Sequence, residues 1–309
     1  MIISNSTDNY TFFKFFMSNP KPNNLKVIIT GCGSRPIGHI YMYNGKPSHD
    51  SIFIDGVEHK MNIGTATAYY LAKKGITVIM VSRNADHLEK IKQGLKSLGC
   101  KEKNILYVAA DLTTMEGIKH LISKLPKSSY FYWVQSIGVG GGTYKILNDN
   151  IYLPFKKIEP ELITTEIGIV ITTHKLMLKM VPIFRKQIKR KQKAKISIIT
   201  SMSGERGYHF GATHVAAKHA LVGYIEGIKR ELNDEGIEIY DIRPGAIDTG
   251  MYDNPFVRKA VNEISKRTKM WSGRAPIYAH PLRVAEKVYL SLFSDKPKKV
   301  YRILAPHQK

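Results

Sequence analysis

Short apolar runs alternate with longer amphipathic stretches along most of the chain. The runs are rich in β-branched residues and bounded by turn residues, a pattern typical of buried strands, at 25–30, 76–82, 104–110, 129–135, 195–200, 236–242 and 298–304. Between them, apolar residues recur at helical spacing in 62–75, 84–100, 113–125, 160–192 and 211–234. Regular alternation of strands and helices predicts an α/β fold, with a doubly wound parallel sheet of about seven strands and helices on both faces.

One segment, residues 35–61, interrupts this alternation after the first strand. Its two apolar stretches, HIYMY and SIFID, flank Asn44-Gly45, a dipeptide suited to a hairpin turn. We therefore expect an inserted, hairpin-like segment within a single domain spanning 25–309, preceded by a polar N-terminal extension at 1–24. The histidines and acidic residues of the insertion follow no familiar ligand spacing, so no metal site is predicted.

Composition narrows the class of protein. Two cysteines make no disulfide framework, which favours a reducing, cytoplasmic location. We find no apolar stretch long enough to predict a transmembrane segment. The formal net charge of +22 would attract anionic partners, and basic residues are densest at 184–195. No aromatic-interleaved basic motif accompanies them, so nucleic-acid binding is not predicted.

The first strand ends in a glycine-rich turn that is suited to phosphate binding. Gly31, Gly33 and Ser34 follow the strand, and Asn62-Ile63 opens the helix beyond the insertion. Glycines let the backbone approach a pyrophosphate, which the helix N-terminus then stabilises. The second strand ends at Arg83 with no carboxylate at its tip, which favours NADP(H) over NAD(H) because Arg accommodates a 2′-phosphate.

The order of several motifs resembles the short-chain dehydrogenase/reductase family, from about residue 25 to 305. These motifs are TG…NIG, AADL at 109–112, SIGVGG at 136–141, IITS…K, and IRPGAIDTGM at 242–251. The resemblance implies a Rossmann-type fold. It also implies that further residues contact the cofactor: Asp111 and Leu112 near the adenine, Ser136, Ile137 and Gly138 along the fourth strand, and Pro244, Gly245 and Thr249 near the nicotinamide.

The same resemblance implies catalytic residues. The family uses a Ser that polarises the substrate carbonyl, a Tyr that exchanges the proton, and a Lys that holds the nicotinamide ribose. Ser201 matches the Ser and Lys218 the Lys, which also binds cofactor. The Tyr position, four residues before the Lys, is His214, so the two side chains share one helix face.

Three interpretations of His214 stay open. It could be the working acid/base, since histidine titrates near neutrality. The chain could keep the cofactor site but lack redox turnover, or the histidine could be a deliberately introduced replacement. Tyr208 is not in register to substitute. The Asn that usually supports the Lys has no clear counterpart, with Thr165 or Glu166 as candidates.

We therefore expect an NADP(H)-dependent carbonyl reductase or alcohol dehydrogenase, with a substrate loop at 249–280. Aromatic, Met and cationic residues in this loop suit an apolar substrate with an anionic handle, such as a 3-oxoacyl thioester. The alternative is a catalytically impaired nucleotide-binding or scaffolding protein. By resemblance, the chain is expected to form a homodimer or homotetramer through its two long helices.

Overall fold

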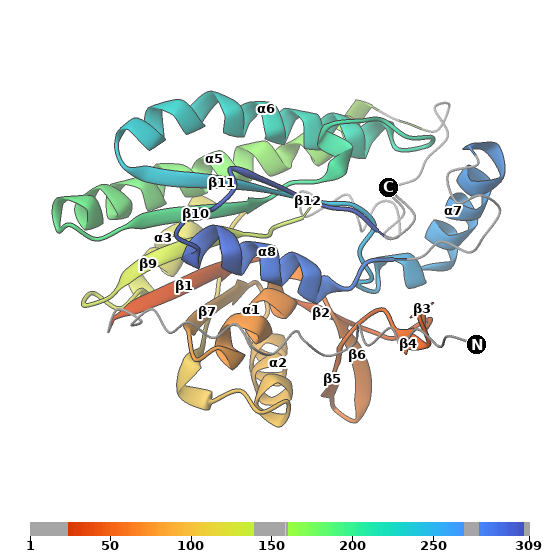
Figure 1. Cartoon of the computed structure of the whole chain (residues 1–309), viewed down its shortest axis with the longest axis horizontal. Coiled ribbons are helices and arrows are strands. Elements are labelled where there is room, and N and C mark those ends of the chain that lie inside the picture. Colours follow the sequence, from red (N-terminus) through yellow and green to blue (C-terminus); the bar gives the residue numbers. More distant parts are fainter. Residues whose placement is uncertain (1–23, 139–157, 159, 269–277, 306–309) are drawn as a thin grey trace, which may run out of the picture.

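The structure, a computed structural model, describes residues 24–138, 158, 160–268 and 278–305 (Figure 1). At its centre is one seven-stranded sheet in the order β12-β11-β10-β9-β1-β7-β8. All neighbouring strands are parallel, which confirms the predicted fold class. The strands are β1 Leu25–Thr30, β7 Thr77–Ser82, β8 Ile105–Ala109, β9 Tyr130–Gln135, β10 Ala194–Ile199, β11 Ile237–Pro244 and β12 Val300–Ile303.

The strand order reverses around β1, which pairs with β7 on one side and β9 on the other. In open parallel sheets the crevice at such a reversal, outside the carboxyl ends of the strands, is where ligands bind. The glycine-rich turn follows β1 directly and therefore lies at this crevice.

Helices cover both faces of the sheet (Figure 1). One hydrophobic cluster joins the sheet to α1, α2 and α8, and the other joins it to α3, α5 and α6. Strands covered on both faces need continuous apolar sequence, which is why β9 and β10 are buried at every position. The helices are α1 Ile63–Lys73, α2 Ala85–Ser97, α3 Met115–Lys124, α5 Pro160–Lys189, α6 Ala212–Asp234, α7 Pro255–Thr268 and α8 Pro281–Phe293.

Helix α5 bears on the expectation of no transmembrane segment. It is the one helix in the described part of the chain that is long and apolar enough to cross a membrane, by length and composition only. Its buried residues recur every three or four positions and face the sheet and α6. Packing against the sheet and α6 accounts for part of its apolar composition, and a core helix can pass the same test, so length and composition are weak evidence of a membrane span.

The segment between β1 and α1 forms two small sheets. Strands β2 Ser34–Pro36, β5 Ser51–Ile54 and β6 Val57–Met61 form one, and β3 Met42–Tyr43 with β4 Lys46–Pro47 forms the other. Asn44-Gly45 closes only the second, short hairpin, while Asp55-Gly56 closes the β5–β6 hairpin. HIYMY and SIFID therefore do not pair with each other, because two X-Gly turns, both with positive φ, divide the segment.

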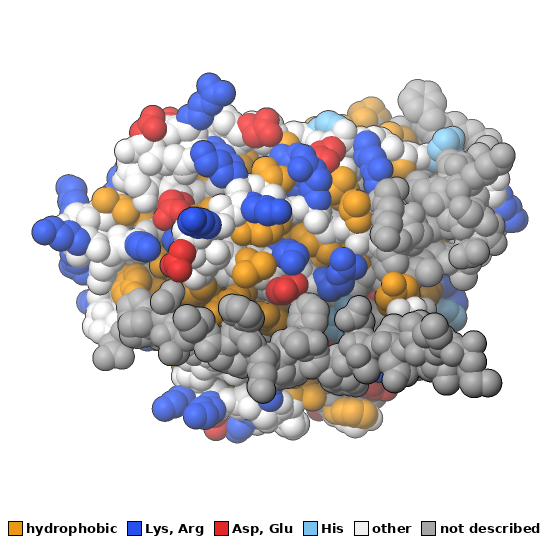
Figure 2. Space-filling model, in the orientation of Figure 1, with side chains coloured by type: hydrophobic (Ala, Val, Ile, Leu, Met, Phe, Trp, Pro, Cys, Tyr) orange, Lys and Arg blue, Asp and Glu red, His pale blue; other side chains and the backbone are white. Residues whose placement is uncertain are grey.

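Surface charge is spread over the molecule. Figure 2 shows lysine and arginine side chains scattered across the visible face, with acidic and apolar side chains between them. Both cysteines are buried and unpaired. Burial raises the pKa of the Cys32 thiol to about 12, so this thiol fills the tight loop and is not a reactive group.

Candidate active site

Three backbone segments meet closely at the carboxyl end of β1. Gly31 has φ +92°, and a Cβ there would lie 2.5 Å from the carbonyl oxygen of Ser136. A Cβ on Gly64 would lie 2.6 Å from the carbonyl oxygen of Gly31. Only glycine fits at both positions. The structure thus brings the predicted residues of the first turn beside those at the end of β9.

Asn62 organises the turn on the helix side. It is the N-cap of α1, its Oδ1 accepts from the backbone N–H of Thr65 at 2.9 Å, and its Nδ2 donates to the carbonyl of Gly31. The N–H of Gly33 donates to Asn62 Oδ1 and to Thr65 Oγ1. Asn and Thr side chains therefore already satisfy an amide of the predicted phosphate loop.

Ser34, the last residue of the predicted loop, contacts two histidines. Its Oγ lies 3.2 Å from His59 Nδ1 and 3.3 Å from His87 Nε2, and its backbone N–H donates to His87 Nε2. Burial lowers the pKa of both histidines, and the nearby His59 and Lys90 side chains lower that of His87 further. Both rings are therefore neutral at neutral pH. Sequence reasoning did not identify them, because they lie far apart along the chain.

Arg83 and Asp111 lie near each other at the ends of β7 and β8. Asp111 Oδ1 accepts from the Oγ1 and the N–H of Thr113, and these bonds, with the more distant Arg83, lower its pKa. Thr114, not Asp111, caps α3. Arg83 is exposed and Leu112 is buried. The guanidinium predicted to accommodate a 2′-phosphate is thus exposed at the strand tip, and the cofactor preference stays a prediction.

Ser201 stands at the junction of β10 and the 3₁₀ helix η3, Met202–Gly204. Its Oγ accepts from the N–H of Ser203 at 3.0 Å and donates to the carbonyl of Pro244 at 3.4 Å. A Cβ on Gly204 would lie 2.9 Å from the carbonyl oxygen of Lys218. The glycine of Ser-x-x-Gly therefore lets the serine turn pack directly against α6 at the lysine.

Lys218 and His214 lie one turn apart on α6, and both have perturbed pKa values. Burial lowers the pKa of Lys218 to about 8, although Glu166 and Asp241 oppose the shift. Burial and the nearby Lys218 charge lower the pKa of His214 to about 3. Lys218 is 6% exposed, and no hydrogen bond or ion pair holds its ammonium within the described residues. His214 Nδ1 is likewise buried without a partner there.

Glu166 is the residue that sequence reasoning could not settle. Thr165 returns its hydroxyl to the carbonyl of Glu161 on its own helix, whereas Glu166 is fully buried on the inner face of α5. Neither carboxyl oxygen has a hydrogen-bond partner in the described structure. Burial raises the pKa of Glu166 to about 7, and the Lys218 charge limits the rise. Of the two candidates for the position of the family's Asn, Glu166 is therefore the one with a buried side chain.

Tyr208 does not replace the missing tyrosine. Its ring covers Gly211, the N-cap of α6, where a Cβ would lie 2.1 Å from a ring carbon. The phenol is half-buried and packs against the cluster on the α1 side of the sheet. Gly211 is therefore needed to admit this ring at the start of α6.

The remaining predicted residues follow β9 and β11. Ser136 donates its N–H to the carbonyl of Thr30, and Gly138 is exposed at the edge of the described segment. Gly245 donates to the carbonyl of Ile303, and the Thr249 N–H to that of Ile247. Residues 255–268 of the predicted substrate loop form helix α7, and residues 269–277 of that loop lie outside the described residues.

These residues fit a dinucleotide at two points. Gly31 and Gly64 let the backbone segments at the end of β1 pack closely. Lys218 is 6% exposed and makes no side-chain hydrogen bond or ion pair in the described structure, and His214 Nδ1 is buried there without a partner. Buried groups of this kind are rare in folded proteins unless a ligand or water completes them. A ribose hydroxyl is a suitable acceptor for the ammonium. No cluster of metal-ligating side chains occurs in the described ranges.

Comparison with known proteins is consistent with this geometry. The model of the short chain dehydrogenase family matches residues 59–259. Dehydrogenase/reductase SDR family member 7 from Mus musculus is 28% identical over 222 residues, 69% of this chain and 61% of the relative. The NADP-dependent 3-hydroxy acid dehydrogenase of Schizosaccharomyces pombe is 27% identical over 60% of this chain and 68% of its own.

Solved structures share the fold. L-sorbose reductase from Gluconobacter frateurii, complexed with NADPH and L-sorbose, has a TM-score of 0.62 at 20% identity and covers 92% of this chain and 96% of its own. An actinorhodin polyketide ketoreductase with NADPH has a TM-score of 0.65 at 16% identity, covering 93% and 98%. The family match begins within the insertion, so residues 35–58 lie outside it.

Proposed function

Because the chain belongs to the short-chain dehydrogenase family, we propose that it is an NADP(H)-dependent oxidoreductase acting on a carbonyl or alcohol. One observation carries the proposal: Lys218, a residue only 6% exposed, makes no side-chain hydrogen bond or ion pair in the described structure, and its backbone carbonyl packs against the serine turn of η3. A bound nicotinamide cofactor would supply or accept the hydride. Gly31, Ser136 and Lys218 would hold it, with Arg83 at the 2′-phosphate.

The protein's own groups would manage the proton. In the reducing direction, the carbonyl carbon gains a hydride and its oxygen must gain a proton. Ser201 Oγ would orient that oxygen by hydrogen bonding. With its low pKa, His214 stays neutral at neutral pH. A neutral ring can donate the proton of one nitrogen to the oxygen while the other nitrogen takes a proton from Lys218, so no charge accumulates on the buried imidazole.

Lys218 and Glu166 would then restore the proton. Their pKa values, about 8 and about 7, lie on either side of neutrality. A proton can therefore pass between such groups without a large barrier at neutral pH. In the oxidising direction the same groups would carry the proton outwards.

The names of relatives support the substrate class. The Schizosaccharomyces pombe relative is an NADP-dependent 3-hydroxy acid dehydrogenase, and FabG from Escherichia coli, 26% identical over 190 residues, is a 3-oxoacyl-[acyl-carrier-protein] reductase. A 3-oxoacyl thioester or a related 3-oxo acid is therefore the first substrate class to test.

The rival function is nucleotide binding without turnover. The low pKa of His214 favours it, because an imidazole that resists protonation is a weak acid/base. Activity with NADPH and a panel of 3-oxo compounds separates the two, with His214→Tyr and Lys218→Ala as variants. Turnover in the wild type that is lost in both variants supports the enzyme. Cofactor binding with turnover only in His214→Tyr supports the rival.

Self-association is proposed on the outer face of α5. Ile163, Ile171 and Leu178 are exposed there at helical spacing. The family resemblance points to pairing through α5 and α6. Sedimentation of the wild type and of a variant with Ile171→Glu and Leu178→Glu tests this, and an unchanged oligomeric state would contradict it.

A further inference from the structure

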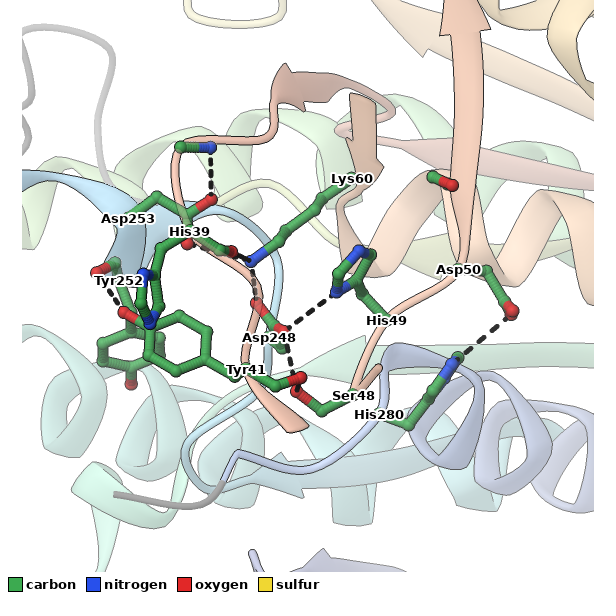
Figure 3. Close-up of polar contacts among 12 residues, drawn as sticks. His39, Tyr41, Ser48, His49, Asp50, Lys60, Asp248, Tyr252, Asp253 and His280 are labelled. Carbon is green, nitrogen blue, oxygen red and sulfur yellow. Dashed lines mark hydrogen bonds and ion pairs between the residues drawn. The ribbon is translucent and has the colours of Figure 1, made fainter. Parts of the chain in front are cut away.

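The insertion carries a fully buried lysine that bonds two aspartates in the loop after β11. Lys60 is 0% exposed. Its Nζ donates to Asp248 Oδ1 at 2.7 Å, to Asp253 Oδ1 at 2.9 Å and to the carbonyl of His39 at 2.6 Å. Figure 3 shows the lysine reaching from the insertion between the two aspartates. A buried ammonium is stable only with such partners.

Asp248 has all its side-chain partners in the insertion. Oδ2 accepts from Ser48 Oγ at 2.7 Å and lies 3.2 Å from His49 Nδ1, while Oδ1 accepts from Lys60 (Figure 3). Burial alone would raise the pKa of this carboxyl group, but the bonds from His49, Lys60 and Ser48 hold it below its ordinary value. We call Ser48, His49 and Lys60 with Asp248 and Asp253 the insertion clamp.

A hydrogen bond and ring contacts add to the insertion clamp. The Tyr41 hydroxyl donates to the carbonyl of Tyr252 at 2.7 Å, and Tyr278 packs against both rings with centroids 4.5 and 4.2 Å apart. A Cβ on Gly38 would lie 3.1 Å from Asp253 Cβ. The insertion and the loop after β11 therefore form one packed unit that neither segment could form alone.

The clamp joins the two sides of the crevice. Asp248 lies immediately before Thr249, in the turn that follows Pro244 and Gly245. The insertion begins and ends in the glycine turn after β1, where the N–H of Asn62 donates to the carbonyl of Gly33 at 3.1 Å. One segment, bonded at both places, thus runs from the predicted phosphate loop to the predicted nicotinamide turn.

We propose that the insertion is a positioning element for the cofactor, in which Ser48, His49 and Lys60 hold Asp248 and so fix the Ile247–Thr249 turn for the nicotinamide half before the cofactor binds. This inference rests on the proposed function. A preformed turn needs no ordering when the ligand arrives, so the free energy of binding loses less to conformational entropy. The adenosine half binds at β7 and β8 and gains nothing from the clamp.

Two ligands separate positioning from general stability. Binding of NADPH and of 2′,5′-ADP, which lacks the nicotinamide half, is measured by calorimetry for the wild type, Ser48→Ala and Lys60→Met. Lys90→Met is the matched control, because Lys90 makes an exposed ion pair with Asp55 of the same insertion. Ser48→Ala removes the hydroxyl that bonds to Asp248 Oδ2 and to the carbonyl of Tyr41, and it keeps every charge, so it remains informative if Lys60→Met does not fold.

We expect Ser48→Ala to weaken the binding of NADPH about tenfold and the binding of 2′,5′-ADP less than twofold. Ser48→Thr should restore NADPH binding. Lys90→Met should change the binding of neither ligand. Amide exchange at 247–249 should be slow in the free wild type and faster in Ser48→Ala. Equal weakening of both ligands, or fast exchange of this turn in the free wild type, overturns the proposal. If the wild type binds NADPH without turnover, the proposed oxidoreductase activity is rejected. The comparison of NADPH with 2′,5′-ADP binding would still decide whether the insertion positions the cofactor. A wild type that binds neither ligand overturns both.

Discussion

Replacing Glu166 by Gln should stabilise the protein at alkaline pH while impairing the active site. Glu166 is fully buried without a hydrogen-bond partner in the described structure, and its pKa rises from 4.5 to about 7. At 1.36 kcal/mol per unit, keeping this carboxylate ionised in the folded state costs about 3 kcal/mol. Gln has nearly the same shape and does not ionise, so the variant avoids this cost.

The stability difference between Glu166→Gln and the wild type depends on pH. Below pH 4.5 the carboxyl group is protonated in both the folded and the unfolded state, and the ionisation contributes nothing. Between pH 4.5 and about 7 the unfolded chain releases the proton first, so the wild type loses stability as pH rises. Relative to the wild type, Glu166→Gln should therefore gain about 3 kcal/mol between pH 4 and pH 8, measured by urea unfolding with an unchanged m-value.

The activity of Glu166→Gln should fall although its stability rises. The Glu166 charge raises the pKa of Lys218, so its loss lets the ammonium deprotonate at lower pH, and the alkaline limb of kcat/KM should shift to lower pH. Glu161→Gln, an exposed position on the same helix, is the control and should change neither quantity. If the stability difference between Glu166→Gln and the wild type is the same at pH 4 and pH 8, the carboxyl group is not ionising in a buried site and the reasoning fails.

Other predictions concern the insertion and the phosphate loop. Lys60→Met removes the ammonium that bonds both Asp248 and Asp253 and should cost about 3–5 kcal/mol in urea unfolding, whereas Lys90→Met should leave the midpoint unchanged. The pKa values of His59 and His87 are lowered from 6.5, so stability should be complete above pH 6.5 and fall as the pH drops below it. Replacing both histidines by Asn should flatten that pH dependence, and an equally steep fall would contradict the assignment. Gly31→Ala should destabilise strongly in thermal unfolding, because its Cβ would meet a backbone carbonyl at 2.5 Å with φ at +92°; a midpoint within a degree of the wild type would refute this.

Much of the fold could be predicted from the sequence because strands buried on both faces leave continuous apolar runs. The pairing inside the insertion could not, since Asn44-Gly45 and Asp55-Gly56 both qualify as hairpin turns and only packing selects the partners. The apolar face of α5 is divided between the sheet and α6. Polar residues at the two ends of α5 interrupt its apolar stretch. A simple search for long apolar runs therefore did not find that the helix is apolar overall.

A motif fixes the spacing of Ser201, His214 and Lys218, so the sequence could single these residues out, and their roles stay predictions. Between Thr165 and Glu166 the spacing does not choose; the structure shows that Glu166 is buried and that the Thr165 hydroxyl bonds its own helix. The insertion clamp carried no local signal, because Lys60 and Asp248 are 188 positions apart. The role of His214, the cofactor preference and the location in the cell stay predictions.

The two ends of the insertion meet at a single pair of residues, Gly33 and Asn62, whose main chains share a hydrogen bond. The central sheet and α1 therefore need no adjustment to accommodate the extra chain, and closing such a loop costs little entropy. The segment 34–61 is in this sense portable: a relative without it could receive it by grafting at the same junction. The graft would hold only if aspartates equivalent to Asp248 and Asp253 were transferred with it, so the smallest transplantable unit is discontinuous in sequence.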